Sequence, residues 1–214
     1  MPISPDAERP YDTAGPAYTR RLATLEGARW KRILDVQRPY RWNLRRLDLG
    51  RTLDVGCGIG RNLAVLAEGS VGVDHNPSSV AVACGRGLRA MTPEEFSHEF
   101  GESAASTQAA FDSLLLAHVL EHMGEAAGLQ LVKHYLPHLR AGGSVVLVCP
   151  QERGYANDET HVRFLDFAAL TQMAQTVGLH VVHRYSFPFP RLAGRAFPYN
   201  EFVLRAQLPA RLGG

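Results

Sequence analysis

Apolar runs bounded by glycine or polar residues alternate with amphipathic stretches over most of the chain. Leucine-rich or β-branched runs at residues 51–56, 70–74, 87–92, 111–117 and 144–150 predict five successive strands. The segments 61–68, 77–86 and 124–139 have helical spacing, and an Ala-Gly-Gly turn after the last predicts where it ends. This alternation predicts an open, mostly parallel α/β sheet.

The C-terminal third has a different pattern. Residues 166–177 have helical spacing that ends at Gly178, whereas residues 179–187 and 201–208 alternate between apolar and polar positions. The alternation predicts an antiparallel pair on either side of a loop rich in proline and arginine. The complete sheet is therefore expected to have seven strands, with helices on both faces. Ligands of such sheets bind beyond the carboxyl ends of the strands.

The N-terminal segment is expected to be organised separately from the sheet. Residues 1–16 are rich in Pro, Asp and Gly, and residues 17–47 have helical spacing that is broken near Pro39. The sequence thus predicts a flexible segment and helical cap over 1–47, and a ligand-binding domain over 48–214. A length of 214 residues and a hydrophobic fraction of 45% suit one domain of ordinary size.

Composition narrows the expected surroundings of the protein. No apolar run approaches the roughly 18 residues of a membrane span, and the first residues lack the apolar core of a secretory signal. Cys57, Cys84 and Cys149 are odd in number and unpatterned, which favours a reducing cytoplasm over a disulfide framework. The net charge of +2 is too small to indicate nucleic acid. We therefore expect neither nucleic acid nor membrane as a partner, and a homodimer is left open.

A glycine-rich loop follows the first strand, in the stretch "LDVGCGIGRN". Glycines at 56, 58 and 60 permit a tight turn and close approach of a ligand to the backbone. Asp74 ends the second strand, 20 residues beyond Asp54, where a carboxylate can accept both ribose hydroxyls of a nucleoside. A dinucleotide fingerprint requires a glycine at position 61, which is arginine here. Asp54 instead suits a cofactor that carries an ammonium group.

These motifs resemble those of the class I S-adenosylmethionine-dependent methyltransferases, which have a Rossmann-like fold. The matching stretches are "LDVGCGIG", "GVDHN" and "FDSLLLAHVLEH", and the resemblance spans about residues 50 to 206. It implies that Asp54 and the loop hold the methionine end of S-adenosylmethionine and that Asp74 binds the ribose. It places Met91 and Thr92 near the adenine, although "AMTPEEF" departs from the commoner acidic form. The complete set of expected cofactor-binding residues is Asp54, Gly56, Cys57, Gly58, Asn62, Asp74, His75, Met91, Thr92 and Ala117, with Cys57 acting as a small loop residue and not as a nucleophile.

A cluster of His118, Glu121 and His122 follows the apolar run at 114–116. Its spacing would place the three side chains on one side of a helical turn. H-x-x-E-H is also the inverted zinc-peptidase signature, but that site requires a long helix and the cluster here follows a strand. A third interpretation is a corner in which the glutamate and histidine cap the next helix. The cluster also resembles the E-x-x-E-H metal site of some O-methyltransferases, with His118 in place of the first glutamate.

The metal interpretation requires a histidine from a later loop, and His161 in "NDETHVRF" supplies one. We therefore expect His118, Glu121, His122 and His161 to bind Mg²⁺ or another divalent cation. A cation lowers the pKa of an acceptor hydroxyl and orients it, while a neutral histidine can take the proton. The expected catalytic residues are His118, His122 and His161.

The acceptor is expected to be a sugar hydroxyl. The whole chain resembles actinobacterial methyltransferases of polymethylated mannose polysaccharides, which implies a mannose oligosaccharide. Aromatic, amide and guanidinium groups suit a sugar, and they occur at Tyr155, Asn157, Asp158, Phe187, Phe189, Arg191, Arg195 and Tyr199. A small lipid, quinone or phenolic acceptor is one alternative. A non-catalytic module that binds the cofactor for regulation is another.

Overall fold

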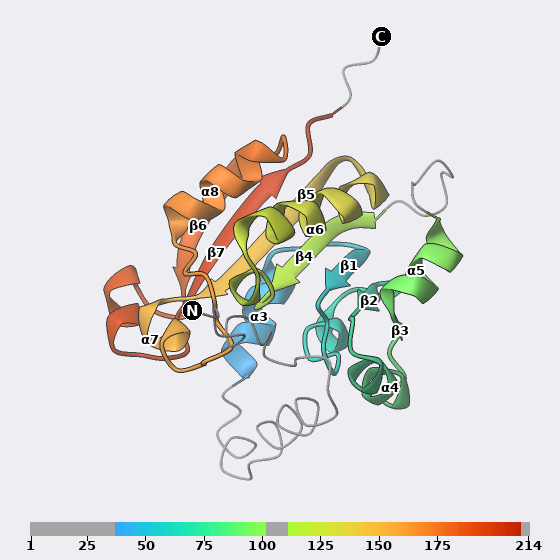
Figure 1. Ribbon diagram of the computed structural model, residues 1–214, viewed down its shortest axis with the longest axis horizontal. Coiled ribbons are helices and arrows are strands. Elements are labelled where there is room, and N and C mark those ends of the chain that lie inside the picture. The colour runs from blue at the N-terminus through green and yellow to red at the C-terminus, as the bar shows by residue number, and fades with distance from the viewer. Residues whose placement is uncertain (1–36, 102–110, 211–214) are drawn as a thin grey trace, which may run out of the picture.

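The computed structural model describes residues 37–101 and 111–210, and its strands form a seven-stranded sheet in the order β3-β2-β1-β4-β5-β7-β6 (Figure 1). The strands are β1 (Thr52–Val55), β2 (Val71–Val73), β3 (Ala90–Met91), β4 (Phe111–Ala117), β5 (Leu139–Pro150), β6 (His180–Phe187) and β7 (Glu201–Gln207). Strands β1 to β5 pair in parallel, whereas β7 is antiparallel to both β5 and β6. The predicted fold class, including the C-terminal antiparallel pair, is confirmed.

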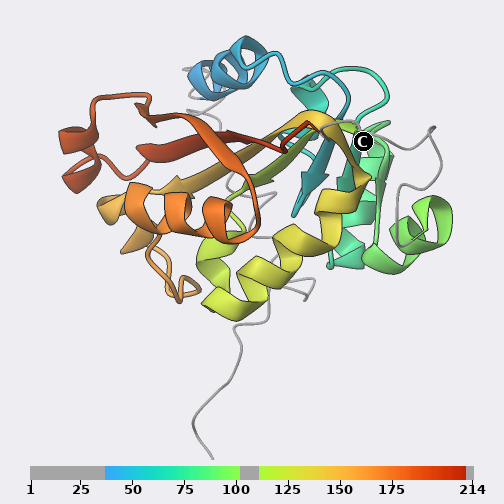
Figure 2. The same cartoon turned by 90° about the horizontal axis from the view of Figure 1, so that it is seen from above.

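Helices cover both faces of this sheet. Helix α3 (Arg38–Arg46) lies on the face opposite to α6 (Glu125–Tyr135) and α8 (Phe167–Thr176), as Figure 2 shows. Helix α5 (Pro93–Phe100) packs into the same core as α6 and α8, while α4 (Pro77–Gly85) packs against the glycine loop. The short helix α7 (Glu152–Tyr155) follows β5 at the carboxyl edge.

Alternation along β4 separates two hydrophobic cores. Leu114 and Leu116 pack with α6 and α8, whereas Leu115 packs with Leu44 of α3 on the other face. All three β4 leucines are buried, and burial of each stabilises the fold by about 1.5–3 kcal/mol. This two-sided burial explains why residues 114–116 are apolar at consecutive positions, as in other parallel sheets. It also fixes where β4 ends and its polar corner begins.

Two of the predicted helices differ from the structure. Residues 61–68 contain only the 3₁₀ turn η1 (Leu63–Val65), after which Leu66 is already extended. The segment is too short to form a helix by itself, and its leucines are instead drawn to the cores on either side. The helix predicted over 124–139 ends at Tyr135 and is followed by the 3₁₀ turn η3 (Leu136–His138). Pro137 accounts for this early end, since it lacks a backbone donor.

The Ala-Gly-Gly turn was interpreted wrongly, because these residues lie within β5, which begins at Leu139. Helices α5 and α7 were not predicted. The signal for α5 was present: Thr92 and Glu95 form a capping box, in which each side chain binds the backbone of the other residue. The sequence "TPEE" had been assigned to cofactor binding alone. A four-residue helix such as α7 leaves no comparable signal.

At the N-terminal boundary, Pro39 lies in the first turn of α3 and does not break it, since the first turn requires no donor there. The flexible segment predicted over 1–16, and the helix predicted over 17–36, lie outside the described residues. The domain boundary near residue 47 stays a prediction. Among the described helices, none combines the length and the apolar character needed to span a membrane.

Candidate functional site

The glycine loop forms a tight turn between the ends of β1 and β2. Backbone N–H groups of Gly56 and Cys57 both donate to the Val73 carbonyl, at 2.7 and 3.1 Å. Gly56, Gly58 and Gly60 all have positive φ, at 75°, 53° and 82°. A Cβ atom on Gly56 would lie 2.2 Å from Cγ2 of Val119. Glycine is therefore required here both by the backbone conformation and by the closeness of the β4 corner.

Two buried carboxylates lie beneath this loop. Asp74 accepts hydrogen bonds from the backbone N–H groups of Gly58, at 2.8 Å, and Asn76, at 2.9 Å. Asp54 is 1% exposed, and its Oδ2 atom has no hydrogen-bond partner among the described residues. Burial, and then the negative charge of Asp74, raise the pKa of Asp54 to about 7. Within residues 37–101 and 111–210, Asp54 thus has no positively charged partner of the kind that a buried carboxylate needs.

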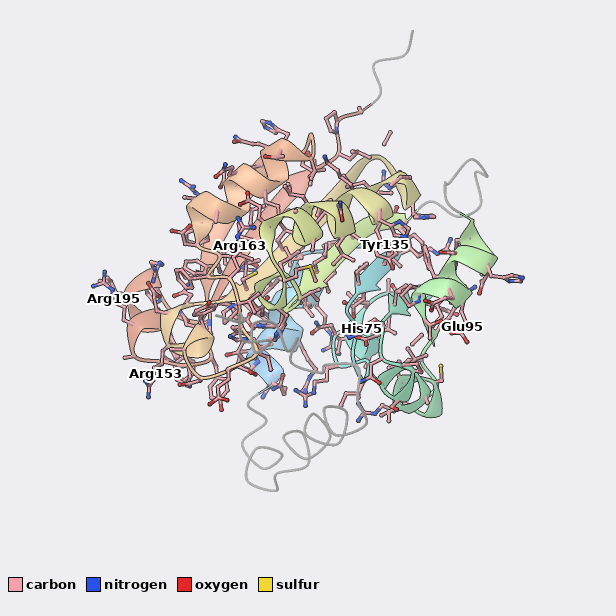
Figure 3. All side chains as sticks on the ribbon, in the orientation of Figure 1. His75, Glu95, Tyr135, Arg153, Arg163 and Arg195 are labelled. Carbon is pink, nitrogen blue, oxygen red and sulfur yellow. The ribbon has the colours of Figure 1, made fainter. Side chains whose placement is uncertain are left out.

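The other expected cofactor residues lie around the same edge. His75, labelled in Figure 3, is exposed directly after β2. Asn62 precedes η1, and Ala117 ends β4. Met91 is buried in the main core, and the Thr92 hydroxyl accepts the backbone N–H of Glu95. Both side chains therefore already have structural partners, although their backbones adjoin the site.

Cys57 occupies the small space that the sequence assigned to it. Its side chain is buried against Gly72, where an added Cβ atom would lie 2.6 Å from the Cys57 Sγ atom. Burial, and then the charges of Asp54 and Asp74, hold the pKa of the thiol far above its ordinary value. Such a thiol does not act as a nucleophile.

The corner after β4 begins with a strained residue. His118 has φ of +59°, which is uncommon for a residue other than glycine, and its N–H donates to the Val148 carbonyl at 2.9 Å. Its ring lies between two carboxylates: Nδ1 is 3.2 Å from Oε1 of Glu121, and Nε2 is 2.8 Å from Oε1 of Glu201. Partial desolvation of the ring, whose side chain is 44% exposed, acts to lower the pKa of His118, but the two carboxylates outweigh it and raise the value to about 10.

Glu121 lies in the 3₁₀ turn η2 (Leu120–His122) and is 0% exposed. Burial raises its pKa, but His118 more than offsets this and leaves the pKa below its ordinary value. Oε1 faces His118, while Oε2 is buried and has no hydrogen-bond partner of standard geometry among the described residues. The nearby thiol of Cys149 is a weak donor, and burial together with Glu121 raises its pKa.

His122 and His161 are held at their Nδ1 atoms. Thr160 donates its hydroxyl to Asp158 at 2.7 Å, so its oxygen accepts the N–H of His122 Nδ1 at 3.0 Å. His161 Nδ1 donates to the Tyr155 carbonyl at 2.9 Å. Both rings therefore keep the lone pair on Nε2, the tautomer that outer hydrogen bonds impose on metal-binding histidines. Burial lowers the pKa of His122, which favours its neutral form.

Glu121, His122 and His161 together form a candidate metal-binding set. One ligand atom from each lies within 4.8 Å of the others. Ligands about 2.1 Å from a shared ion lie at most about 4.2 Å apart, so this set is slightly wider than a closed shell. The residues fit a divalent cation, since they offer one buried carboxylate oxygen without a standard hydrogen bond and two imidazole Nε2 atoms. His118 is outside the set, because both of its nitrogens face carboxylates; its role as a direct ligand stays a prediction.

The sequence matches a family model described as "Methyltransferase domain" over residues 28–184. The chain belongs to this methyltransferase family. No curated protein matches it.

Solved structures support the same fold for the methyltransferase domain. A SAM dependent methyltransferase from Archaeoglobus fulgidus has a TM-score of 0.58 at 16% identity, covering 82% of this chain and 99% of that one. A TehB-like SAM-dependent methyltransferase from Corynebacterium glutamicum has a TM-score of 0.60 at 18% identity, covering 90% and 98%. Magnesium protoporphyrin IX methyltransferase from Synechocystis PCC 6803, with bound SAM, has a TM-score of 0.59 at 12% identity, covering 96% and 100%.

Two alternatives for the histidine cluster disagree with the structure of the methyltransferase domain. The cluster follows a strand and occupies a single 3₁₀ turn, so the long helix of a zinc peptidase is not formed here. Helix α6 has Gly124 at its N-cap, and the side chains of Glu121 and His122 bond to His118 and Thr160 instead of capping the helix. The arrangement of Glu121, His122 and His161 agrees with the metal interpretation.

Glu201 is the site residue that the sequence did not reveal. It is the first residue of β7 and pairs with Pro150, the last residue of β5. Because β7 is antiparallel, its first residue lies at the edge where the parallel strands end. The predicted antiparallel topology is enough to place residue 201 at this edge of the sheet. The alternating pattern of "EFVLRAQL" alone predicts only a strand. Gln151 holds Glu201 in place by donating from Nε2 to its carbonyl at 2.9 Å.

Proposed function

We propose that this methyltransferase domain transfers the methyl group of S-adenosylmethionine to a hydroxyl group held beside a divalent cation at Glu121, His122 and His161. The observation that carries the proposal is a pair of buried carboxylates, each with one unpartnered oxygen. Asp54 Oδ2 lies beneath the glycine loop and Glu121 Oε2 lies in the adjoining corner. A buried carboxylate oxygen without a partner is costly, so each suits a positively charged ligand.

At the cofactor side, the residues fit S-adenosylmethionine. Asp54 can accept hydrogen bonds from the ammonium group of the cofactor. The resulting ion pair would offset the free-energy cost of burying the carboxylate. Asp74 keeps acceptor capacity for ribose hydroxyls, since two backbone donors occupy only part of its two oxygens. Of the structural neighbours, the Archaeoglobus fulgidus protein is a SAM dependent methyltransferase and the Synechocystis enzyme has bound SAM. When bound, the sulfonium supplies an electrophilic methyl group, so the protein mainly contributes position.

At the corner, Glu121, His122 and His161 would hold the cation, which lowers the pKa of a bound hydroxyl. Two imidazoles and one carboxylate suit Mn²⁺, Co²⁺ or Zn²⁺. Mg²⁺ is expected from the resemblance described above, with water and acceptor oxygens completing its shell. As the carbon–oxygen bond forms and the carbon–sulfur bond breaks, S-adenosylhomocysteine would leave and the hydroxyl proton would pass to solvent, which reaches this corner beside the 44% exposed side chain of His118. Both ring nitrogens of His118 face carboxylates, those of Glu121 and Glu201, which favours a positioning role for this residue over proton acceptance.

We propose a sugar hydroxyl of a mannose-type oligosaccharide as the acceptor. The side chains around the corner support a sugar: the Tyr155 ring stacks on His161 with centroids 5.4 Å apart, and Tyr199 is exposed. Arg191 pairs with Glu152 beside them. Figure 3 shows Arg153 and Arg195 on the same outer end of the molecule. Planar and polar groups of this kind recognise hydroxyls and the faces of sugar rings.

A lipid, quinone or phenolic acceptor is the second candidate, because apolar side chains near the corner are exposed. Val162, Phe189 and Leu192 are 58%, 49% and 73% exposed. An apolar acceptor would cover such residues. The cytoplasm remains the proposed location, in agreement with the free thiols of Cys57, Cys84 and Cys149.

The test is a panel of acceptors with S-adenosylmethionine labelled at its methyl group. The panel contains mannose oligosaccharides, phenols, quinones and amines, each assayed with Mg²⁺, Mn²⁺, Co²⁺ or Zn²⁺. We expect labelled mannose oligosaccharides whose new methyl ether is located by NMR. Labelling of phenols or quinones alone would support the second candidate, and labelling of nitrogen would refute both. A protein that binds S-adenosylmethionine but labels nothing would indicate a non-catalytic module.

A further inference from the structure

His118 connects two acidic residues that are far apart in the sequence. One ring nitrogen is 3.2 Å from Glu121 and the other is 2.8 Å from Glu201, which is 83 positions further along the chain. The ring is 44% exposed on its side chain, whereas the carboxylates are 0% and 13% exposed. His118 thus lies between a fully buried carboxylate and one that reaches the surface of the site.

This bridge determines which oxygen of Glu121 is available. With Oε1 facing His118, only Oε2 is left without a hydrogen bond, and Glu121 contributes a ligand atom to the set formed with His122 and His161. Without the bridge, the carboxylate could rotate and Oε1 would lose its partner. The left-handed backbone of His118 supports the same interpretation, because such strain persists where the surrounding structure fixes a residue for function.

We propose that Glu201 and His118 are positioning residues that orient Glu121 toward a divalent cation, an inference that rests on the proposed metal-assisted function. Glu201 holds Nε2 of His118, and His118 in turn holds Oε1 of Glu121. Outer hydrogen bonds of this kind tune metal sites, and their loss typically weakens metal affinity by about 10–100-fold. Neither residue has to touch the cation.

The position of Glu201 is itself well determined. Gln151 and Asn200 are both 0% exposed, and Nδ2 of Asn200 donates to Oε1 of Gln151 at 3.0 Å. Gln151 also donates to the Glu201 carbonyl at 2.9 Å and to the Ser186 hydroxyl at 2.8 Å. This buried network fixes the start of β7, and therefore the direction from which Glu201 approaches His118.

The experiment measures Co²⁺ binding to the full-length protein by calorimetry and by its visible absorption spectrum. Glu201→Ala removes the bond to His118, and we expect about 10–100-fold weaker Co²⁺ binding with a shifted spectrum. Glu201→Gln keeps an acceptor oxygen, so it should restore part of the affinity. Glu125→Gln is the matched control, since Glu125 is exposed near the same corner but pairs with Arg163. S-adenosylmethionine affinity and melting temperature are measured for every variant.

The outcomes separate the inference from the proposed function. If wild-type protein binds none of Mg²⁺, Mn²⁺, Co²⁺ and Zn²⁺, the metal-assisted function fails and the inference fails with it. If wild type binds Co²⁺ and folded Glu201→Ala binds it equally well with the same spectrum, only the inference is overturned. A higher KM for the acceptor with unchanged Co²⁺ binding would also overturn it, since Glu201 would then bind the acceptor. Should Glu201→Ala not fold, Glu201→Gln gives the same decision, through a smaller loss of affinity.

Discussion

Asp54 and Glu121 are both buried carboxylates with one unpartnered oxygen, yet their surroundings differ. Burial and the neighbouring Asp74 raise the pKa of Asp54 to about 7. Burial also acts to raise the pKa of Glu121, but His118 lowers it overall. The cofactor region therefore relies on a ligand for its positive charge, whereas the corner after β4 already contains one. This difference separates a region built to bind a charged cofactor from a region built to position a second group.

The largest effect is expected at the corner. Replacing His122 or His161 with alanine removes one of three candidate ligands, so metal-stimulated turnover should fall by at least about 100-fold. S-adenosylmethionine affinity, measured by calorimetry, should stay nearly unchanged because Asp54 and Asp74 are untouched. His180→Ala is the control, since this exposed histidine lies at the opposite edge of the sheet. Full turnover in either ligand variant would contradict the claim that the corner after β4 holds a catalytic cation.

An effect of comparable size is expected at the cofactor region. Asp74→Ala removes charge-assisted hydrogen bonds to the ribose and should weaken S-adenosylmethionine binding by roughly 2–4 kcal/mol. It also leaves the N–H groups of Gly58 and Asn76 without their acceptor, so stability falls as well. Asp74→Asn keeps one acceptor oxygen and should lose less of both. Calorimetry that finds wild-type affinity in a folded Asp74→Ala protein would contradict the ribose assignment.

The sequence predicted the cofactor region better than the corner, for a physical reason. Gly56, Gly58 and Asp74 lie within one strand–loop–strand unit, so local spacing indicates their meeting. The corner combines Glu121, His161 and Glu201, which are brought together by the pairing of β5 with β4 on one side and with β7 on the other. Spacing alone could suggest His161, because a loop histidine after the fifth strand lies at the same edge. It could not show that His118 would turn toward Glu201.

The sequence predicted seven successive strands and the C-terminal antiparallel pair, because buried strands leave a strong pattern of apolar positions. The predicted secondary structure was wrong in short segments whose conformation is determined by tertiary packing. Residues 61–68 have helical spacing but form only η1, and the glycines at 142 and 143 lie inside β5 instead of ending a helix. The capping box of α5 is a local sequence signal for a helix start, but Thr92 was considered only as a cofactor-binding residue.

Gly56 is where the two regions touch, so its replacement tests whether they are independent. Gly56→Ala combines a positive φ with a Cβ atom 2.2 Å from Val119, and should destabilise the fold by about 1–3 kcal/mol in urea unfolding. Gly87→Ala is the matched control: its φ is also positive, at 78°, but the added Cβ atom would meet nothing within 4 Å. It should cost less. Equal losses in the two variants would show that contact with the corner is unimportant.

The smallest effect is expected from pH. The folded-state pKa of Asp54 is raised from 3.8 to about 7, so the ligand-free protein binds more protons than the unfolded chain between those values and loses stability as pH rises through that window. S-adenosylmethionine favours ionised Asp54, so its affinity should fall by at most about tenfold per pH unit below pH 7. Asp54→Asn should flatten both dependences. If calorimetry finds the same pH dependence of affinity in Asp54→Asn as in wild type, a group other than Asp54 is responsible for that dependence.

Turnover after chelation tests most directly whether the corner holds a catalytic cation. The purified protein is treated with a chelator, assayed with S-adenosylmethionine and an accepted hydroxyl substrate, and then supplied with Mg²⁺, Mn²⁺, Co²⁺ or Zn²⁺ one at a time. We predict that chelation removes turnover while S-adenosylmethionine binding persists, and that at least one single metal restores the rate in wild type but not in His161→Ala. Full activity in the presence of the chelator would contradict the metal assignment and make the histidine cluster structural.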